Sequence, residues 1–115
     1  MLVRVDATAA EALYLQIAAQ LRAAIGKGDP GPGDQLPPAR ELAEGLGVNM
    51  HTVLRAYAEL RDEGLVEMRR RRGVIVQDTG PGRARLIDLV RRATAEARRQ
   101  GLESRDLQHL VAEVW

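Results

Sequence analysis

Two helix-forming segments of this chain are separated only by Gly47 and Val48, and this tight break constrains the fold more than any other feature of the sequence. The first segment, "PARELAEGL" at 38–46, is short and opens on a proline, which the first turn of a helix tolerates. The second follows Asn49, a residue type favoured at helix N-caps, and continues until Gly64. Two helices joined by so short a glycine turn have the length and spacing of a helix-turn-helix.

A further helix is expected before this pair. Thr8 and Glu11 have the spacing of a capping box, so this helix is predicted to run from there to Gly26 or Gly28. Its apolar residues recur on one face: Tyr14, Ile17, Ala18, Leu21, Ala24 and Ile25. The segment "GDPGPGDQLPP" at 28–38 then predicts a fixed turn and no flexible linker, because proline restricts φ.

The two helices around the break also have apolar stripes, which predict one common core. In the longer helix the stripe has i, i+3, i+4, i+7 spacing and consists of Val53, Ala56, Tyr57 and Leu60. In the shorter helix it consists of Leu42, Ala43 and Leu46.

Two β-prone stretches come next, "LVEMR" at 65–69 and "GVIVQ" at 73–77. Their alternation of apolar and polar residues predicts a hairpin. Its tip is cationic, with Arg70, Arg71 and Arg72 in succession. In a regular pleat Arg69 points to the opposite face from Arg70, so the four consecutive arginines cannot all face one partner.

The last third of the chain predicts two more helices after a hinge in "DTGPG", 78–82. The first carries the apolar stripe Leu86, Val90, Ala93 and Ala97. The second, with Ser104 as its expected cap, carries Leu107, Leu110, Val111, Val114 and Trp115. The 33 residues of 83–115 cannot bury both stripes by themselves, so these faces are expected to meet a partner.

Composition excludes several classes of protein. The chain has 115 residues, enough for one core with an extension, and no apolar run of the roughly 18 residues that a membrane span needs. We expect a soluble, cytoplasmic protein. With no cysteine and two distant histidines, we expect no metal site and no cofactor. No nucleophile–base set or phosphate loop is present, so we expect no enzyme.

Charge has to act locally in this chain, because the formal net charge is only +1. The cations are 16 arginines and one lysine, and the planar guanidinium of arginine binds phosphates and guanine edges in a bidentate way. At the start of the longer helix, Asn49, His51, Thr52 and Arg55 lie off the apolar stripe or at its margin. Short polar side chains at this position can reach base edges when a helix end enters the major groove. The plainer reading is that Asn49 only caps the helix.

The order of helix, short helix, glycine turn, longer helix and basic hairpin is that of a winged helix. The segment 33–76, "GDQLPPARELAEGLGVNMHTVLRAYAELRDEGLVEMRRRRGVIV", resembles the DNA-binding domain of the GntR family of bacterial transcription regulators. The upstream "ALYLQIAAQLRAAI" is similar to the first helix of that family. The resemblance covers about two-thirds of the chain. It implies a mainly α fold with a small β-wing: a winged helix-turn-helix domain at 1–77, the hinge at 78–82 and a two-helix dimerisation segment at 83–115.

The resemblance also implies which residues contact DNA. They lie at the start of the short helix, at the start of the longer one and at the wing: Arg40; Asn49, Met50, His51, Thr52 and Arg55; and Arg70, Arg71, Arg72 and Gly73. Two positions depart from the family pattern. Met50 stands where many members have arginine or proline, so the operator sequence does not carry over. Arg71 stands where the wing usually has its first glycine, which leaves the path of the wing open.

The 39 residues after Val76 are too few for the effector domain of larger relatives and resemble the YtrA-like branch. That resemblance implies a homodimer formed through the tail stripes, which would read an inverted-repeat operator with half-sites about 34 Å apart. We expect a repressor of transcription. A small apolar effector could occupy a cleft lined by the tail, although no residue cluster marks one.

Three alternatives remain open from the sequence. The winged helix could be a protein-interaction module that binds no DNA, an idea that the cationic hairpin tip argues against. The tail could fold back on its own domain and leave the protein monomeric. In the tail and its approach, Arg83, Arg85, Arg91 and Arg92 could contact phosphates, although a solvated face explains them better.

Overall fold

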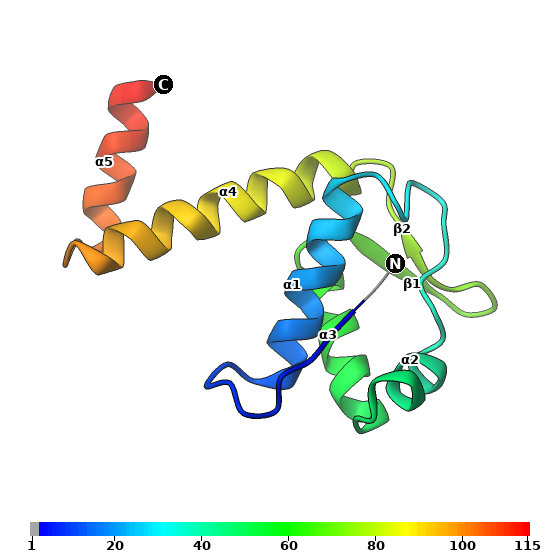
Figure 1. Ribbon diagram of the computed structural model, residues 1–115. Helices are drawn as coiled ribbons and strands as arrows, with labels where there is room; N and C mark the ends of the chain where they lie inside the picture. The colour runs from blue at the N-terminus through cyan, green and yellow to red at the C-terminus, as the bar shows by residue number, and fades with distance from the viewer. Residues whose placement is uncertain (1–2) are drawn as a thin grey trace. The chain divides into compact units, whose positions relative to one another are not determined.

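Five helices and one two-stranded hairpin make up the protein in the computed structural model, which describes residues 3–115 (Figure 1). The elements in chain order are α1 Leu13–Gly26, α2 Ala39–Leu46, α3 Met50–Asp62, β1 Val66–Arg69, β2 Gly73–Val76, α4 Gly80–Arg99 and α5 Ser104–Val114. The predicted fold class, mainly α with a small β-wing, is therefore confirmed. Within the described residues, no helix combines the length and apolar character that crossing a membrane requires.

The chain forms two compact units, of which the first ends at Arg85 and the second comprises Leu86–Trp115. The boundary falls inside α4, and residues 80–82 of the expected hinge belong to the first turn of that helix. The assignment of 1–77, 78–82 and 83–115 as functional parts stays a prediction, and residues 1 and 2 lie outside the described part.

The core of the first unit lies where α1, α2, α3 and the hairpin meet (Figure 1). Both α1 and α3 bury most of the stripe that their spacing predicts: Ile17, Ala18, Leu21 and Ile25 from α1, and Val53, Ala56, Tyr57 and Leu60 from α3. Tyr14 and Ala24 of the predicted α1 stripe are only half-buried. From α2 only Ala43 is fully buried, while Leu42 and Leu46 are half-buried at the edge. Full burial of one such aliphatic side chain contributes about 1.5–3 kcal/mol.

The first helix begins later than its sequence suggests. Thr8 and Glu11 do not cap it, because the Asp6 carboxylate accepts hydrogen bonds from the backbone amide and hydroxyl of Thr8, at 2.9 and 2.6 Å. These bonds hold the pKa of Asp6 below its usual value. They fix a local turn, and α1 starts only at Leu13. An aspartate that binds its own neighbouring backbone competes with helix formation in this way.

The proline-rich connection between α1 and α2 is more than a turn, because it adds a short extended edge to the hairpin. The Leu36 amide donates to the Val74 carbonyl at 2.8 Å, and the Gly33 amide donates to the Val76 carbonyl at 2.9 Å. In return, the Val76 amide donates to the Asp34 carbonyl at 2.9 Å. The isolated bridge between Gln35 and Ile75 belongs to the same pairing. The wing is therefore fixed to the segment that leads into α2.

Tyr57 joins α3 to the entry of α2. Its buried hydroxyl donates to the Pro37 carbonyl at 2.6 Å, one residue before the N-cap of α2. Burial, and then the negative charge of Glu41, raise the pKa of Tyr57 well above its usual value. The side chain therefore keeps its proton, and the donor that holds α2 in place is always present.

Helix ends in the first unit are tied together by arginines. Arg22 of α1 forms a bidentate ion pair with Glu63, at 2.6 and 2.7 Å, and its side chain is 3% exposed. From the second turn of α4, Arg85 donates to the Gly26 carbonyl at the end of α1, at 2.8 Å. Arg83 donates to the Glu63 carbonyl just after α3. Cations at helix C-termini satisfy carbonyls that lack intrahelical partners and interact favourably with the helix dipole.

In the second unit α5 follows the last part of α4 after a short turn. The expected cap, Ser104, is wrong by one residue, because Glu103 is the N-cap and forms a capping box with Asp106. The Asp106 carboxylate accepts from the Glu103 amide at 2.8 Å. Ser104 is the first helical residue, and its hydroxyl accepts a bond from Gln108 at 2.9 Å. A longer acidic side chain at residue 103 can reach the free amides that a serine would otherwise bind.

The pair Arg22–Glu63 predicts an asymmetry between two neighbouring carboxylates. Glu63→Ala leaves a buried guanidinium without its bidentate partner and should lower the free energy of unfolding by about 3 kcal/mol. Asp62→Ala removes only an exposed pair with Arg61 and should change it by less than about 0.5 kcal/mol. Urea unfolding followed by circular dichroism measures both. Equal changes in the free energy of unfolding for the two substitutions would show that the buried pair stabilises the fold no more than the exposed pair does.

The raised pKa of Tyr57 predicts how stability changes in alkali. Above about pH 10 the unfolded chain loses the phenolic proton while the folded protein keeps it, so stability falls with rising pH, by about 1.4 kcal/mol per pH unit from this group. Tyr57→Phe should cost about 1 kcal/mol at pH 8 through the lost hydrogen bond. Above pH 10 the same variant should show a shallower loss than the wild type. Parallel urea-unfolding curves from pH 8 to 11 for both proteins would contradict this.

Candidate nucleic-acid interface

The start of α3 is organised by its cap. Asn49 has an extended backbone, and its side-chain oxygen accepts a hydrogen bond from the His51 amide at 2.7 Å. The structure thus confirms that Asn49 is a cap. Its capping oxygen is engaged, and the rest of its exposed amide faces solvent. The free amides of this first turn give it positive potential, which suits an anionic partner.

Further side chains of the first turns of α3 lie on the surface, as the off-core pattern predicts. His51 and Arg55 are exposed, and Met50 and Thr52 are half-buried. Together with Leu13 and Tyr14 of α1, three of these residues, His51, Thr52 and Arg55, line a cleft of about 340 Å³. The Arg55 guanidinium lies over the Tyr14 ring, 3.9 Å from its centroid. The start of α1 and the start of α3 therefore form one surface.

The turn between α2 and α3 sets the position of this surface. Gly47 ends α2 with a φ of +70°, a left-handed conformation that glycine adopts without strain. After this reversal the Val48 amide donates back to the Ala43 carbonyl at 3.1 Å. Arg40, the second residue of α2, is exposed. Both helices thus present polar residues at their amino ends.

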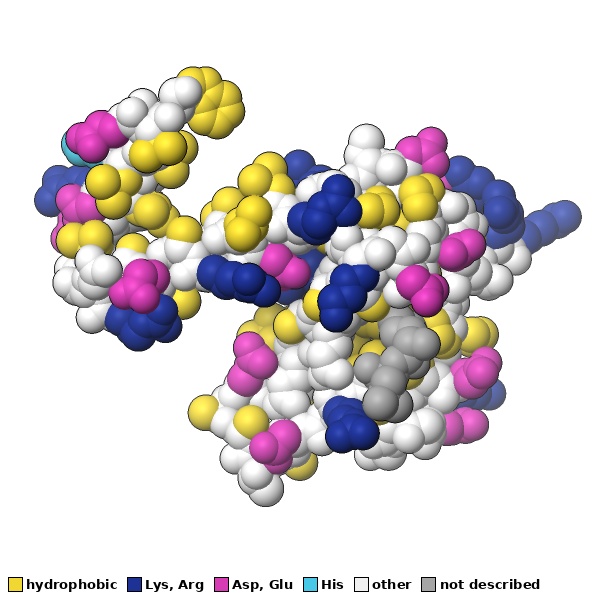
Figure 2. All heavy atoms as spheres, turned by 45° about the horizontal axis from the view of Figure 1, so that its top comes forward, with side chains coloured by type: hydrophobic (Ala, Val, Ile, Leu, Met, Phe, Trp, Pro, Cys, Tyr) yellow, Lys and Arg dark blue, Asp and Glu magenta, His cyan; other side chains and the backbone are white. Residues whose placement is uncertain are grey.

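The hairpin forms a wing with a cationic tip. Its strands pair from Val66↔Val76 to Arg69↔Gly73, so Arg70, Arg71 and Arg72 form a three-residue loop and all three are exposed. In Figure 2 dark-blue cationic side chains project from the edge of the first unit, on the side where Figure 1 places the loop between β1 and β2. Together with Arg69, these residues form a run of four consecutive arginines.

The path of the wing, which the sequence left open, depends on Gly73. It has a φ of +74°, while no non-glycine residue in the described chain has a positive φ. Gly73 directly follows this loop as the first residue of β2, and glycine adopts such a left-handed conformation without strain. A side chain there would also place its Cβ 2.9 Å from the Gln35 amide nitrogen. Arg71 therefore needs no glycine-like backbone, and its replacement of a family glycine adds charge without strain.

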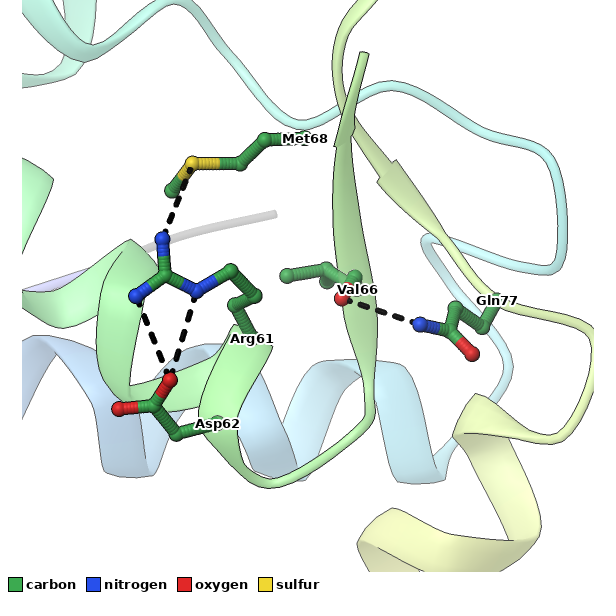
Figure 3. Close-up of polar contacts among 5 residues, drawn as sticks. All are labelled: Arg61, Asp62, Val66, Met68 and Gln77. Carbon is green, nitrogen blue, oxygen red and sulfur yellow. Dashed lines mark hydrogen bonds and ion pairs between the residues drawn. The ribbon is translucent and has the colours of Figure 1, made fainter.

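Other arginines are engaged within the protein. Arg69 pairs with Glu67 on the same strand, with 2.6 Å between Nε and the carboxylate, and so does not join the loop arginines. Arg61 contacts the Asp62 carboxylate and the Met68 sulfur (Figure 3). Figure 3 also shows the Gln77 amide donating to the Val66 carbonyl at the base of the hairpin, at 3.2 Å. Arg61 and Arg69 are exposed as well, but they differ from the loop arginines in having partners within the protein.

Two arginines near the start of α4 also stabilise the fold. Arg83 and Arg85, considered above as phosphate contacts or solvated charges, instead bind the carbonyls of Glu63 and Gly26. Tyr14 and Gln35 are surface partners that the sequence did not single out, because Tyr14 was assigned to the core stripe of α1 and Gln35 to a turn. The position of Tyr14 in the first turn of α1, opposite a cation on another helix, can be seen only in three dimensions.

The arrangement can bind a polyanion. Within residues 3–115, no three histidine, aspartate or glutamate side chains are grouped so that they could hold a metal ion. Apart from Met50 and Gly73, the predicted contact residues at the starts of α2 and α3 and at the wing are donors or cations, which match phosphates and the acceptor edges of bases.

Comparisons with known proteins agree with this geometry. Residues 13–76 match the family model described as bacterial regulatory proteins, gntR family. The chain is 34% identical to the HTH-type transcriptional regulator Rv1152 of Mycobacterium tuberculosis, over 96% of this chain and 92% of that protein. It is 30% identical to the HTH-type transcriptional repressor YtrA of Bacillus subtilis, over 98% and 92%.

Solved structures show the same likeness. YtrA from Sulfolobus acidocaldarius, a GntR-family transcription factor, is 40% identical, with a TM-score of 0.64 over 83% of this chain and 99% of that one. A GntR family transcriptional regulator from Listeria monocytogenes is 26% identical, with a TM-score of 0.66 over 96% and 100%. The matched region contains α1 to β2, the elements that carry the exposed donors. The chain therefore belongs to the GntR family of transcription regulators, as a short, YtrA-like member with a DNA-binding winged helix.

Proposed function

We propose that this regulator represses transcription by binding an inverted-repeat operator as a homodimer. The observation that carries the proposal is the pairing of exposed polar side chains at the start of α3 with three exposed arginines at the wing tip. In this arrangement the amino end of α3 enters the major groove, where Asn49, Met50, His51 and Thr52 meet base edges. The wing contacts the neighbouring backbone.

The exposed cations fall into two groups with different positions relative to the bound DNA. Arg40 at the start of α2 and Arg55 on α3 flank the groove-reading residues, and Arg70, Arg71 and Arg72 with Gly73 form the wing contact. Because the net charge is only +1, these local cations supply the attraction to phosphate. Each phosphate neutralised should contribute about 0.9 to the salt dependence of log K.

Homodimerisation is supported by the apolar surface of the second unit. On α5, Leu110 and Val111 are about half exposed, Val114 is 85% exposed and Trp115 is fully exposed. These four residues line a hollow of about 520 Å³. Leu107 is half-buried beside them. An apolar surface of this kind on a small protein marks an interface, and two-fold symmetry lets two copies cover each other.

The α4 stripe contributes less evenly. Leu86 and Val90 are 59% and 53% exposed, Ala93 is exposed, and Ala97 is buried near the turn to α5. Leu89, which the predicted stripe omitted, is as exposed as Leu86. We therefore assign Leu86, Val90 and Ala93 to the dimer surface together with α5, while Ala97 supports the turn from within its own unit.

Repression follows from size and from the likeness to YtrA of Bacillus subtilis, which is named a repressor. A small dimer seated on a promoter blocks polymerase without further machinery. A small apolar effector that binds in the α5 hollow would compete with dimerisation. The operator sequence can be found by selecting tight binders from a random duplex pool.

Different residues should control affinity and specificity. Arg71→Ala should weaken binding to cognate and random duplexes alike and lower the salt slope by about 1, because a phosphate contact is lost. His51→Ala and Thr52→Ala should reduce preference for the cognate duplex by roughly ten-fold each, since base contacts are worth about 1–3 kcal/mol. The duplex is first selected by the wild-type protein from a random pool at about 150 mM salt, and fluorescence anisotropy measures binding.

The matched control for this prediction is Arg105→Ala, which removes one arginine from α5 that pairs with Glu103. Its salt slope should equal that of the wild type. Equal losses on cognate and random DNA for Arg71, His51 and Thr52 variants would remove the division between positioning and reading residues.

A charge on the α5 face should separate the protomers. Leu110→Asp or Val111→Asp buries a carboxylate in an apolar interface, so sedimentation should give the 12.6 kDa protomer in place of a species of twice that mass. Operator affinity should fall by about 10²-fold because the two half-site contacts lose their linkage. Ala112→Asp, at an exposed position on the other side of α5, is the control and should leave both unchanged. Unaltered mass and affinity for Leu110→Asp would refute the role of this face.

A further inference from the structure

One contact at the interface joins two helices that the family pattern treats separately. Tyr14, the second residue of α1, is half-buried, and its ring supports the exposed Arg55 guanidinium at 3.9 Å from the centroid. The helices α1 and α3 pack along each other (Figure 1), so the ring is held by the core of the unit. The Tyr14 ring therefore restricts the orientation of the Arg55 side chain at the surface of α3.

The geometry of stacking leaves the arginine free to bind a second partner. A cation–π contact uses the face of the guanidinium. The N–H donors lie in its plane and point outward, where they can grip a phosphate in a bidentate way. An arginine held before binding also loses less side-chain entropy when DNA arrives.

The surroundings of Arg55 favour a phosphate as that partner. The cleft is lined by Leu13, Tyr14, His51, Thr52 and Arg55, and none of these carries a carboxylate. Its polar side-chain groups are the hydroxyls of Tyr14 and Thr52, the His51 ring and the Arg55 guanidinium, all able to donate. The cleft also adjoins the first turn of α3, beside the residues assigned to the groove, where the sugar-phosphate backbone of a bound duplex would pass.

We propose that Tyr14 is a positioning residue for DNA binding: its ring orients Arg55 so that the guanidinium edge meets one backbone phosphate at the α1–α3 cleft. This role rests on the proposed function of the winged helix. It makes α1 a functional part of the interface and more than a core helix. Tyr14 itself acts through Arg55, and the aromatic face, not the hydroxyl, carries the effect.

The test is a double-mutant cycle on the duplex that the wild-type protein selects from a random pool. Tyr14→Leu should weaken binding about three-fold, as the loss of an exposed cation–π contact would. Tyr14→Phe keeps the ring and should bind like the wild type. In an Arg55→Ala background Tyr14→Leu should have no further effect, and in an Arg61→Ala background the three-fold loss should persist. Arg61 lies on the same helix but contacts Asp62 and Met68.

The salt slope and a spectroscopic signal distinguish positioning from a structural role. Arg55→Ala should lower the slope by about 1. In the free wild type, the ring current of Tyr14 should shift the Arg55 Nε–H resonance upfield, and Tyr14→Leu should abolish that shift while urea unfolding shows a folded domain. An unshifted resonance in the wild type would overturn the contact itself.

Different results would overturn the proposed DNA-binding function and the positioning role of Tyr14. A wild-type protein that selects no duplex overturns the proposed function and, with it, this role of Arg55. A wild type that binds while Tyr14→Leu binds equally well, or more tightly, overturns the positioning role alone. The same holds if Tyr14→Leu weakens binding as much in the Arg55→Ala background as in the wild type.

Discussion

The packing of the buried face of α3 against its neighbours sets the positions of the other elements of the first unit. Val53, Ala56, Tyr57 and Leu60 are all at most 1% exposed, and they pack against α1, α2 and β1 at once. Each apolar side chain buried in this way contributes about 1.5–3 kcal/mol. The same helix can then leave its amino end in solvent, because the stripe has already fixed its rotation. A reading surface and a core stripe thus share one helix without competing for the same residues.

Polar contacts convert this core into a defined geometry. Tyr57 reaches the Pro37 carbonyl and so holds the entry to α2. Arg22 pairs with Glu63 across α1 and the end of α3, and Arg83 and Arg85 bind carbonyls at the ends of the same two helices. Breaking one partner of a buried pair is costly, so such contacts disfavour alternative packings. The positions of exposed donors on α2, α3 and the wing follow from these ties.

Charge in this chain is significant only through its placement. Arginines that bind carboxylates or carbonyls within the fold stabilise helix ends and strands, as Arg69 does with Glu67. The wing arginines lie in a loop that projects from the unit, and their field is not cancelled by the overall composition. Tyr14 and Arg55 represent an intermediate case, because the cation is exposed but its orientation is set by a half-buried ring. The α5 face shows the corresponding principle for apolar groups, since Trp115 is fully exposed in a single chain.

Local sequence patterns were enough to predict the order of the helices, the Gly47 break, the Asn49 cap, most of the core stripes of α1 and α3, and the hairpin with its cationic tip. These features depend on local periodicity, capping and turn chemistry, which act over a few residues. The sequence-based prediction misplaced the start of α1 and the cap of α5. Asp6 binds Thr8, the expected cap of α1, and Glu103 takes the capping position that Ser104 was expected to fill. Three contacts could be seen only in the folded chain: the pairing of 33–36 with β2, the stacking of Arg55 on Tyr14, and the binding of Arg83 and Arg85 to helix ends. Those contacts join residues far apart in the chain, and no local pattern records which distant partner a side chain will meet once the core has formed.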